Sequence, residues 1–317
     1  STVIDLVICM PGNADNDAFD VARDIKGKFP NIHCVVLTPF SHGITKRMQN
    51  EDLSIFDYVF CWLGNTNLIL SIIKLIEDKM NLEHDIQEAG VQMILLVEDS
   101  IRFYSSILPN LYNYILEQSK NFSQEALNRH AATMRMRGRP KVVLARTYEE
   151  AQKLYDKYSD NTLGVISDAR FPLKSAAKAF GNEVMPEEKP KHRTDTFGRE
   201  KCPDAGLQLF RYIRKNDPFV PLIIESSESE NRAKAEAEGF RFVDKNSKKM
   251  SVDLRRLMEE HMGFGDFIFR DPKTHEEIMR IHSLKELQDN IFNIPNDSML
   301  YHISRNHVSR WLYSRAM

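Results

Sequence analysis

The chain has 317 residues, of which 42% are hydrophobic and 28% are charged, and its formal net charge is −2 at pH 7. This length predicts about two or three domains, each able to bury a core. The balanced charge gives no overall attraction to nucleic acid or to anionic membranes. No apolar run approaches the ~20 residues of a membrane span, and no signal peptide is evident, so we expect no membrane partner.

The four cysteines do not have the spacing of a metal site. Three of them, Cys9, Cys34 and Cys61, lie in apolar strand-like runs, whereas Cys202 follows a polar segment. Unpaired cysteines in such runs are typical of buried thiols in reduced proteins. We therefore expect a cytoplasmic protein.

Residues 1–80 contain short apolar runs separated by helix-like stretches. Such runs are typical of buried strands, and their alternation with helices indicates a parallel α/β sheet. The polar segment 81–90 is expected to be a linker. The expected strands are Val3–Cys9, His33–Leu37 and Asp57–Trp62, and the expected helices run from Asn16 to Phe29 and from Asn67 to Met80.

Residues 91–141 begin with the apolar run Met93–Val97, which ends in Glu98 and Asp99. Apolar residues at helical spacing predict a helix over Ile101–Gln118 and a second one over Ser123–Met136. The first is long enough to offer a surface for a homodimer. The basic run 135–141 contains an Arg-Gly-Arg-Pro sequence of the kind that enters the minor groove. We favour a solvated loop, because such hooks occur in disordered tails.

Residues 142–263 continue the alternation of strands and helices. A polar segment rich in Lys and Pro, 173–203, interrupts it, and this insertion is expected to be either a lid beside the site or a plain surface loop. The expected strands are Val142–Ala145, Leu163–Ile166, Pro221–Glu225 and Phe240–Asp244, and the expected helices are Ala205–Lys215, Glu228–Glu238 and Val252–His261.

Polar side chains stand at the ends of four of these strands. Parallel strands present their carboxyl ends at one edge of a sheet, where ligands bind in open α/β folds. We therefore expect one cluster there. Its members are the acidic pair Glu98 and Asp99, then Asp168, Ser226 and Lys245.

This order of residue types resembles the receiver domain of two-component response regulators. Asp168 has Pro172 four residues later, Asp204-Ala205-Gly206 matches the acidic-x-Gly that opens the next helix, and Phe242 precedes Lys245 by three residues. Asn246 stands where the family usually has proline, so the local turn geometry stays open.

The resemblance implies a flavodoxin-like (βα)5 doubly wound sheet for residues 91–263, with Asp168 as phosphoacceptor. Carboxylates and Mg²⁺ relieve the repulsion between an aspartate and an incoming phosphoryl group. Lys245 and Ser226 would contact the phosphoryl oxygens, and Phe242 would be the switch aromatic. The implied Mg²⁺ ligands are Glu98, Asp99, Asp168 and the backbone carbonyl of Arg170.

Residues 1–80 resemble the second half of another receiver that has lost its chemistry. Cys9 and Met10 occupy the acceptor region, and Cys61 or Trp62 stands at the lysine position; only Thr38 keeps its type. We interpret this part as a truncated pseudo-receiver in a tandem arrangement. Without its first two strands the Val3–Cys9 strand has an open edge. A fragment, a partly ordered protein and a cleavage product are alternative explanations.

Residues 264–317 form a small α+β tail without a helix-turn-helix pattern. We expect a hairpin from 267 to 280 and helices Leu284–Phe292 and Asp297–Ser314. His302 and His307 are five apart, off a common helix face, so no metal site is expected. The stretch 301–313 resembles the junction in large Bacteroidetes proteins where two receiver-like domains precede a phosphoenolpyruvate synthase or pyruvate phosphate dikinase-like region. Any dikinase activity would lie outside this chain.

The function predicted from the sequence is a receiver, phosphorylated on Asp168 by a sensor histidine kinase or a small phosphodonor, which switches a dimer or an attached effector. It would catalyse only its own phosphorylation and dephosphorylation. The alternative is a phosphorylation-independent scaffold that regulates a fused phosphoenolpyruvate synthase-like enzyme. A metal-dependent phosphatase would lack a separate nucleophile. A DNA-binding regulator is disfavoured by the net charge and the tail.

Overall fold

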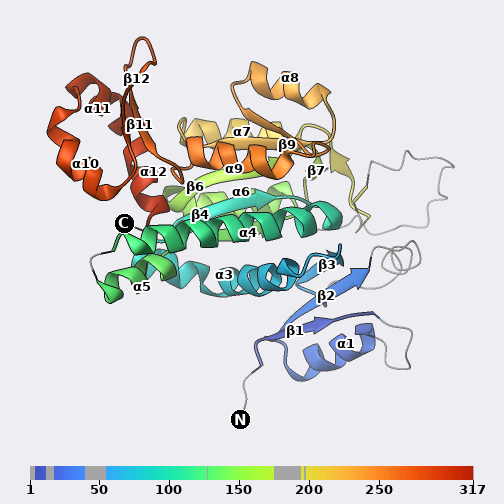
Figure 1. Cartoon of the computed structure of the whole chain (residues 1–317). Coiled ribbons are helices and arrows are strands. Elements are labelled where there is room, and N and C mark those ends of the chain that lie inside the picture. The colour runs from blue at the N-terminus through green and yellow to red at the C-terminus, as the bar shows by residue number, and fades with distance from the viewer. Residues whose placement is uncertain are drawn as a thin grey trace.

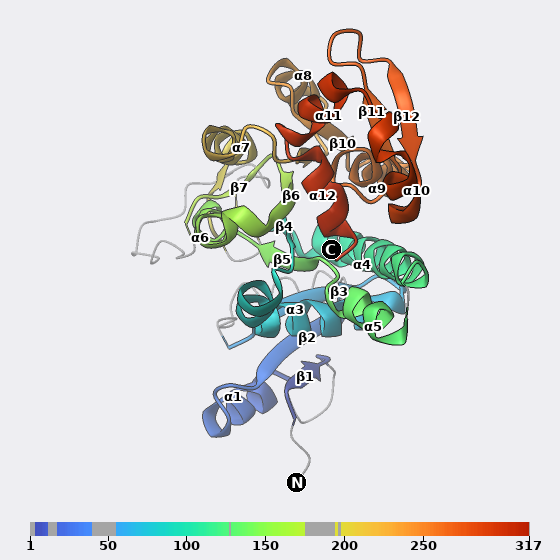
Figure 2. The ribbon, with the colours of Figure 1, turned by 90° about the vertical axis from the view of Figure 1, so that its left-hand side faces the viewer.

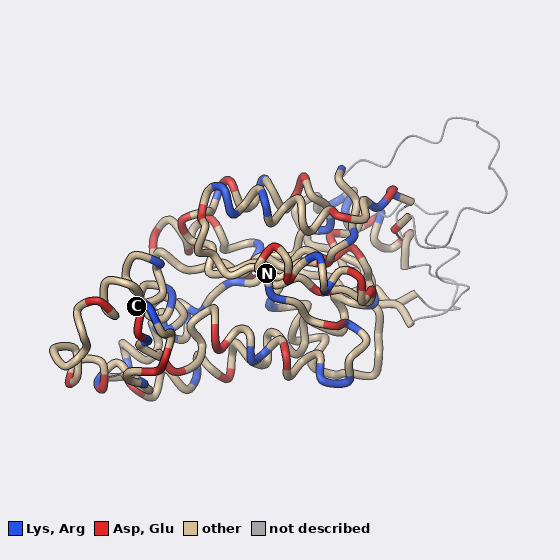
Figure 3. The backbone as a smooth tube through the Cα atoms, turned by 90° about the horizontal axis from the view of Figure 1, so that it is seen from above, with Lys and Arg blue, Asp and Glu red and all other residues tan. Residues whose placement is uncertain are grey.

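The computed structural model describes residues 4–11, 18–39, 55–126, 128–174, 194–195 and 198–316. Over these ranges the chain is an α/β protein with two parallel sheets and a smaller C-terminal unit (Figure 1). Lys and Arg are interspersed with Asp and Glu along the backbone (Figure 3). Within the described part of the chain, no helix combines the length and the apolar character needed to cross a membrane.

The first sheet is parallel and has the strand order β1-β2-β3, with helix α1 packed beside it. The three expected strands are confirmed, although the expected starts at Val3 and Asn16 lie outside the described residues. Cys9, Cys34 and Cys61 are buried as expected, and Cys202 is half-buried. The elements are β1 (Leu6–Cys9), α1 (Ala18–Lys28), β2 (His33–Pro39) and β3 (Tyr58–Trp62).

The expected helix end at Met80 is wrong, because helix α3 (Asn67–Ala89) continues through the segment 81–90 that was expected to be a linker. Leu82 is buried against the core of the next sheet, so the polar residues around it form only the outer side of the helix. The helix ends at Gly90, whose φ of 61° is a left-handed conformation that glycine adopts without strain.

The second sheet has five parallel strands in the order β10-β9-β6-β4-β5. Both of its faces are covered, so the strands are apolar on both sides. Ile94 and Leu96 point into one core cluster, whereas Leu95 and Val97 point into the other. The strands are β4 (Met93–Val97), β5 (Lys141–Ala145), β6 (Thr162–Asp168), β9 (Leu222–Ser226) and β10 (Arg241–Asp244).

Helices cover the two faces of this sheet in two groups. One face is covered by α4 (Ile101–Gln124) and α9 (Met250–His261). The opposite face is covered by α6 (Tyr148–Tyr158), followed by the 3₁₀ turn Ser159–Asn161, and by α7 (Ala205–Asn216) and α8 (Glu230–Ala237).

Helix α4 runs past its expected end at Gln118, and helix α5 (Arg129–Arg137) begins later than expected. The start of α5 is set by Asn128, whose side-chain oxygen accepts a hydrogen bond from the Ala131 N–H at 2.9 Å. Ser123 does not begin a helix, because it lies in the last turn of α4.

Helix α4 also connects the two sheets (Figures 1 and 2). The Tyr104 hydroxyl donates a hydrogen bond to the Val59 carbonyl of β3. The Ser105 hydroxyl oxygen accepts one from the Cys61 N–H at 2.9 Å. The core on this side of the larger sheet is therefore continuous with the core of the first sheet.

Arg139 is buried in an ion pair and does not lie in the solvated loop that we expected. Its guanidinium donates to both carboxylate oxygens of Asp78, at 2.6 and 3.1 Å. The same carboxylate accepts hydrogen bonds from the Tyr112 hydroxyl and the Val142 N–H, each at 2.9 Å. The pair thus fixes α3 along the outer strand β5.

The C-terminal tail contains the expected hairpin, but its last helix is two helices. The antiparallel hairpin is followed by a short helix with a 3₁₀ turn. The final break falls at Asn306, whose φ of 58° lies in the left-handed region that ends a helix. The elements are β11 (Phe267–Arg270), β12 (Glu277–Ile281), α10 (Leu284–Asn290), the 3₁₀ turn Ile291–Asn293, α11 (Asn296–Ile303) and α12 (His307–Ser314).

This break brings His302 and His307 into contact, contrary to the expectation from their spacing. His302 Nε2 accepts a hydrogen bond from the Arg270 N–H at 3.0 Å, so the neutral ring carries its proton on Nδ1. That nitrogen lies 3.0 Å from His307 Nδ1 and donates to it. The two imidazoles therefore join α11 and α12 and hold them to the hairpin.

The tail is docked on the five-stranded sheet through α12. Arg310 Nη2 lies 3.0 Å from Asp217 Oδ2, at the end of α7. The Trp311 indole N–H donates to the Gly265 carbonyl at 2.9 Å. The Arg315 guanidinium lies 4.3 Å from the centre of the Phe122 ring of α4. The C-terminal end of the tail accordingly lies against α4 (Figure 2).

We predict that Arg139→Ala lowers the free energy of unfolding by about 3–5 kcal/mol, because it removes the two-bond charge partner of the buried Asp78 carboxylate and leaves only Lys141, at 3.8 Å, as its cation. Urea unfolding followed by circular dichroism measures the change. The matched control is Arg137→Ala, which removes an exposed arginine nearby and should change the stability by less than ~0.5 kcal/mol. Equal effects of the two substitutions would contradict a structural role for Arg139.

We also predict that the tail loses stability as the pH falls from about 6.5 to 4. Burial, with the neighbouring His307, lowers the pKa of His302 to about 4. The unfolded chain, with a histidine pKa of about 6.5, then binds more protons than the folded one in this window, which destabilises the fold by on the order of 1–2 kcal/mol at pH 5.

The buried Trp311 allows urea unfolding of the tail to be followed by fluorescence at pH 7 and pH 5. His302→Gln should reduce the difference in stability between the two pH values. His130→Gln, at an exposed position, should leave that difference as in the wild type. The same pH dependence in His302→Gln and wild type would show that His302 does not contribute to it.

Candidate functional site

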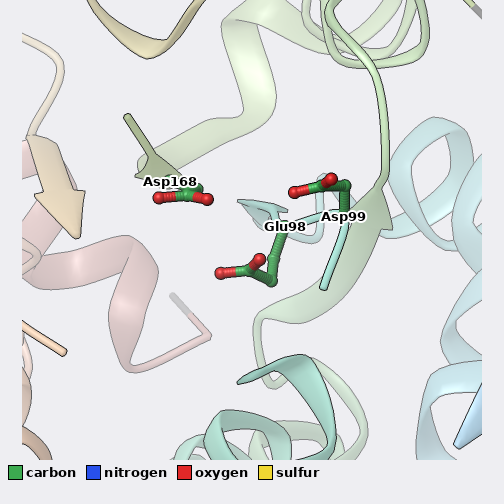
Figure 4. Close-up of side chains that lie close together, drawn as sticks. All are labelled: Glu98, Asp99 and Asp168. Carbon is green, nitrogen blue, oxygen red and sulfur yellow. The ribbon is translucent and has the colours of Figure 1, made fainter. Parts of the chain in front are cut away.

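The carboxyl ends of β4, β6, β9 and β10 meet at one edge of the larger sheet. Glu98 and Asp99 follow β4, and Asp168 is the last residue of β6. A carboxylate oxygen from each lies within 4.8 Å of the others, and Figure 4 shows the three groups around a common space. Ser226 ends β9 and Lys245 follows β10, so the expected residues come together.

Lys245 lies between two of the carboxylates and is almost fully buried. Its ammonium donates a hydrogen bond to Glu98 and lies 3.0 Å from Asp168 Oδ1. Burial acts to lower the pKa of this ammonium, but the charges of Asp168 and Glu98 outweigh burial and raise the pKa above its usual range. The neighbouring carboxylates therefore favour the protonated, cationic form of Lys245.

Asp168 is the carboxylate most open to solvent, with 13% of its side chain exposed against 1% for Glu98. Its Oδ1 accepts a hydrogen bond from the Ala169 N–H at 2.7 Å. Helix α7 begins close to the backbone of Asp168. A Cβ added at Gly206 would lie only 2.3 Å from the Asp168 carbonyl oxygen. The glycine of the acidic-x-Gly sequence thus permits this close approach.

Ser226 lies at the site, and its hydroxyl is held by the turn that follows it. Its oxygen accepts hydrogen bonds from the Glu228 N–H at 3.1 Å and from the Asn231 amide at 2.9 Å. The Asn246 amide donates to the Ser227 carbonyl at 3.0 Å and so connects the β9 and β10 loops.

A cavity of about 220 Å³ opens over Asp168. Its volume corresponds to several water molecules. The lining is mostly polar. It consists of Ser100, Phe103, Asp168, Arg170, Thr194, Lys201, Ser226, Ser227, Glu228 and Lys245.

Phe242 and Arg170 each contact a charged side chain outside the cluster. The Phe242 ring is half-buried, with the Arg232 guanidinium 4.6 Å from its centre. The Arg170 side chain lines the cavity and lies 3.1 Å from Glu228 Oε2. The proposed role of the Arg170 carbonyl as a metal ligand stays a prediction.

Two charged residues of the site were missed from the sequence. Lys201 Nζ lies 2.7 Å from Asp99 Oδ2, and it comes from the end of the polar insertion, where no strand pattern marks it. Glu225 is buried at the end of β9 with both carboxylate oxygens unpartnered among the described residues. Burial raises the pKa of Glu225 to about 7, against the opposing charge of Lys245. The sequence feature that could have identified Glu225 is its position at the end of the apolar run 222–224.

The donor set fits a small hard cation such as Mg²⁺. All three groups are carboxylates, the ligands such ions prefer. Asp99 Oδ1 is buried and accepts no hydrogen bond from any described residue. Burial raises the pKa of Asp99 to about 6, with Lys201 opposing and Asp168 adding to the rise; burial likewise raises the pKa of Glu98. Burial thus favours the neutral forms of Glu98 and Asp99, and a cation that binds the cluster would favour their ionised forms.

Comparison with models of known protein families gave no match to this chain, and comparison with curated proteins gave none either. Function is accordingly inferred from the geometry of the site.

Proposed function

We propose that residues 91–263 are a receiver domain of the two-component type, which accepts a phosphoryl group on Asp168 in the presence of Mg²⁺. The observation that carries this proposal is the contact of the buried Lys245 ammonium with Asp168 beside an acidic pair. The strand order is a further support. Numbered from β4, the order is 2-1-3-4-5, as in flavodoxin-like folds.

Each side chain has a distinct task in this proposal. Asp168, the most exposed of the three carboxylates, is the nucleophile, and the cavity above it admits the phosphodonor. Lys245 compensates charge that builds up on the phosphoryl oxygens. Ser226 donates its hydroxyl to one of these oxygens.

Mg²⁺, when bound, would screen the repulsion between Asp168 and the incoming phosphoryl group. Glu98, Asp99 and Asp168 would hold it, with the Arg170 carbonyl as a further ligand. Glu98 Oε1 already accepts a hydrogen bond from the Ser100 N–H at 2.9 Å, which fixes its orientation at the start of α4.

The switch would follow from the pull of the phosphoryl group on Ser226. Moving this hydroxyl toward Asp168 requires it to leave Asn231 and the Glu228 N–H, so the β9 loop must rearrange. Phe242, half-buried on the neighbouring strand β10, would then repack. Phosphorylation would thus shift a two-state equilibrium of this face.

The remaining parts of the chain would transmit or support this switch. The first sheet has Cys9 and Met10 in the region where a receiver needs Asp, and Cys61 or Trp62 where it needs Lys, which favours a packing role for a silent pseudo-receiver. The docked tail follows α9 directly and would carry the change onward. The second candidate, a scaffold that regulates a fused phosphoenolpyruvate synthase-like region without phosphorylation, is favoured by this silent first sheet.

Acetyl phosphate with Mg²⁺ should add one phosphoryl group to the wild-type protein, as measured by intact mass. Asp168→Asn should gain none, because it lacks the nucleophile. The control is Asp253→Asn, which removes a partly exposed carboxylate on α9 and should gain the same mass as wild type. Beryllofluoride should bind wild type in the same Mg²⁺-dependent manner. A folded wild-type protein that takes up no phosphoryl group would overturn the receiver proposal and favour the scaffold.

A further inference from the structure

Lys201 places a second ammonium in the proposed metal site, and no feature of the acceptor chemistry requires it. Its Nζ lies 2.7 Å from Asp99 Oδ2, and its side chain is 16% exposed at the wall of the cavity. Asp99 is fully buried, so this ion pair is shielded from water on the carboxylate side. The ammonium occupies the neighbourhood that a cation on Asp99 would need.

The backbone of Lys201 is held next to the segment that follows Asp168 by a short antiparallel ladder. Strand β8 (Lys201–Cys202) pairs with β7 (Phe171–Pro172), which begins three residues after Asp168. In this ladder Lys201 lies opposite Pro172.

The turn that leads into β8 is held as well. The Arg199 N–H donates to Asp195 Oδ1 at 2.8 Å, and Thr194 forms a bridge with Glu200. The position of the lysine is therefore built into the fold.

We propose that Lys201 is a tethered counter-ion that competes with Mg²⁺ for Asp99 and so sets the affinity of the site for the metal. The proposal rests on the receiver function inferred above. With all groups ionised, three carboxylates face two ammonium groups, and each carboxylate contacts one of them. A divalent cation can enter this cluster only if one ammonium moves away.

Lys201 is the ammonium that can leave. Lys245 is 1% exposed and contacts both Glu98 and Asp168, so its departure would leave two carboxylates without a partner. Lys201 contacts only Asp99 within the cluster and lies at the cavity wall, where its head group can turn toward solvent while its stem stays in place. Removing its charge should therefore favour metal binding.

Isothermal titration of Mg²⁺ into the full chain tests this proposal without any phosphoryl transfer. Lys201→Met should bind Mg²⁺ about three- to tenfold more tightly than wild type, because no ion pair must be broken. Lys201→Arg keeps the cation and should stay close to the wild-type affinity. Lys153→Met removes an exposed lysine on α6 and controls for the change in net charge. Thermal unfolding without Mg²⁺ verifies that each variant is folded.

An unchanged or weaker Mg²⁺ affinity in Lys201→Met would overturn the competition. If that variant instead bound beryllofluoride more weakly at saturating Mg²⁺, Lys201 would be a phosphoryl ligand, which also overturns it. Either result with intact phosphorylation of Asp168 would leave the receiver function standing. An absence of Mg²⁺ binding by both wild type and Lys201→Met would overturn both proposals.

Discussion

The balance of charge among three clustered carboxylates and two lysines is the constraint on which the site depends. Glu98 and Asp99 are buried, and a buried carboxylate without a partner costs several kcal/mol. Lys245 can satisfy Glu98 and Asp168 together only because β6, β9 and β10 are in parallel register. The sheet therefore brings Asp168, Glu98 and the Lys245 ammonium together.

The parts of this site that follow from strand periodicity could be predicted, and the parts that come from the insertion could not. Asp168 and Lys245 each follow an apolar run, and parallel strands deliver such residues to one edge. Lys201 reaches Asp99 through a two-residue ladder that closes a long polar segment, and its pairing opposite Pro172 is decided by tertiary packing. A polar segment in a sequence does not show which of its charges turn inward.

The same limit explains the errors outside the site. Asp78 lies near the end of an expected helix, and Arg139 lies in an expected solvated loop. The two are far apart in the sequence, yet they form a buried ion pair. The apolar periodicity also predicted one helix where the structure has α11 and α12. Asn306, in the left-handed conformation, breaks the helix without changing the apolar pattern. Strands and cores were predictable because hydrophobic burial decides them, whereas buried polar partners depend on contacts between distant elements.

The first sheet has a structural role through its contacts with helix α4, and this role requires no reactive side chain in that sheet. The helix begins directly after Glu98 and Asp99, and one turn later its side chains hydrogen-bond to β3. Both bonds go to main-chain groups of β3, so they hold the helix whatever side chains that strand carries. A displacement of α4 at the acidic pair would have to break these bonds or move β3 with it. The first sheet thus restrains the start of α4, next to Glu98 and Asp99.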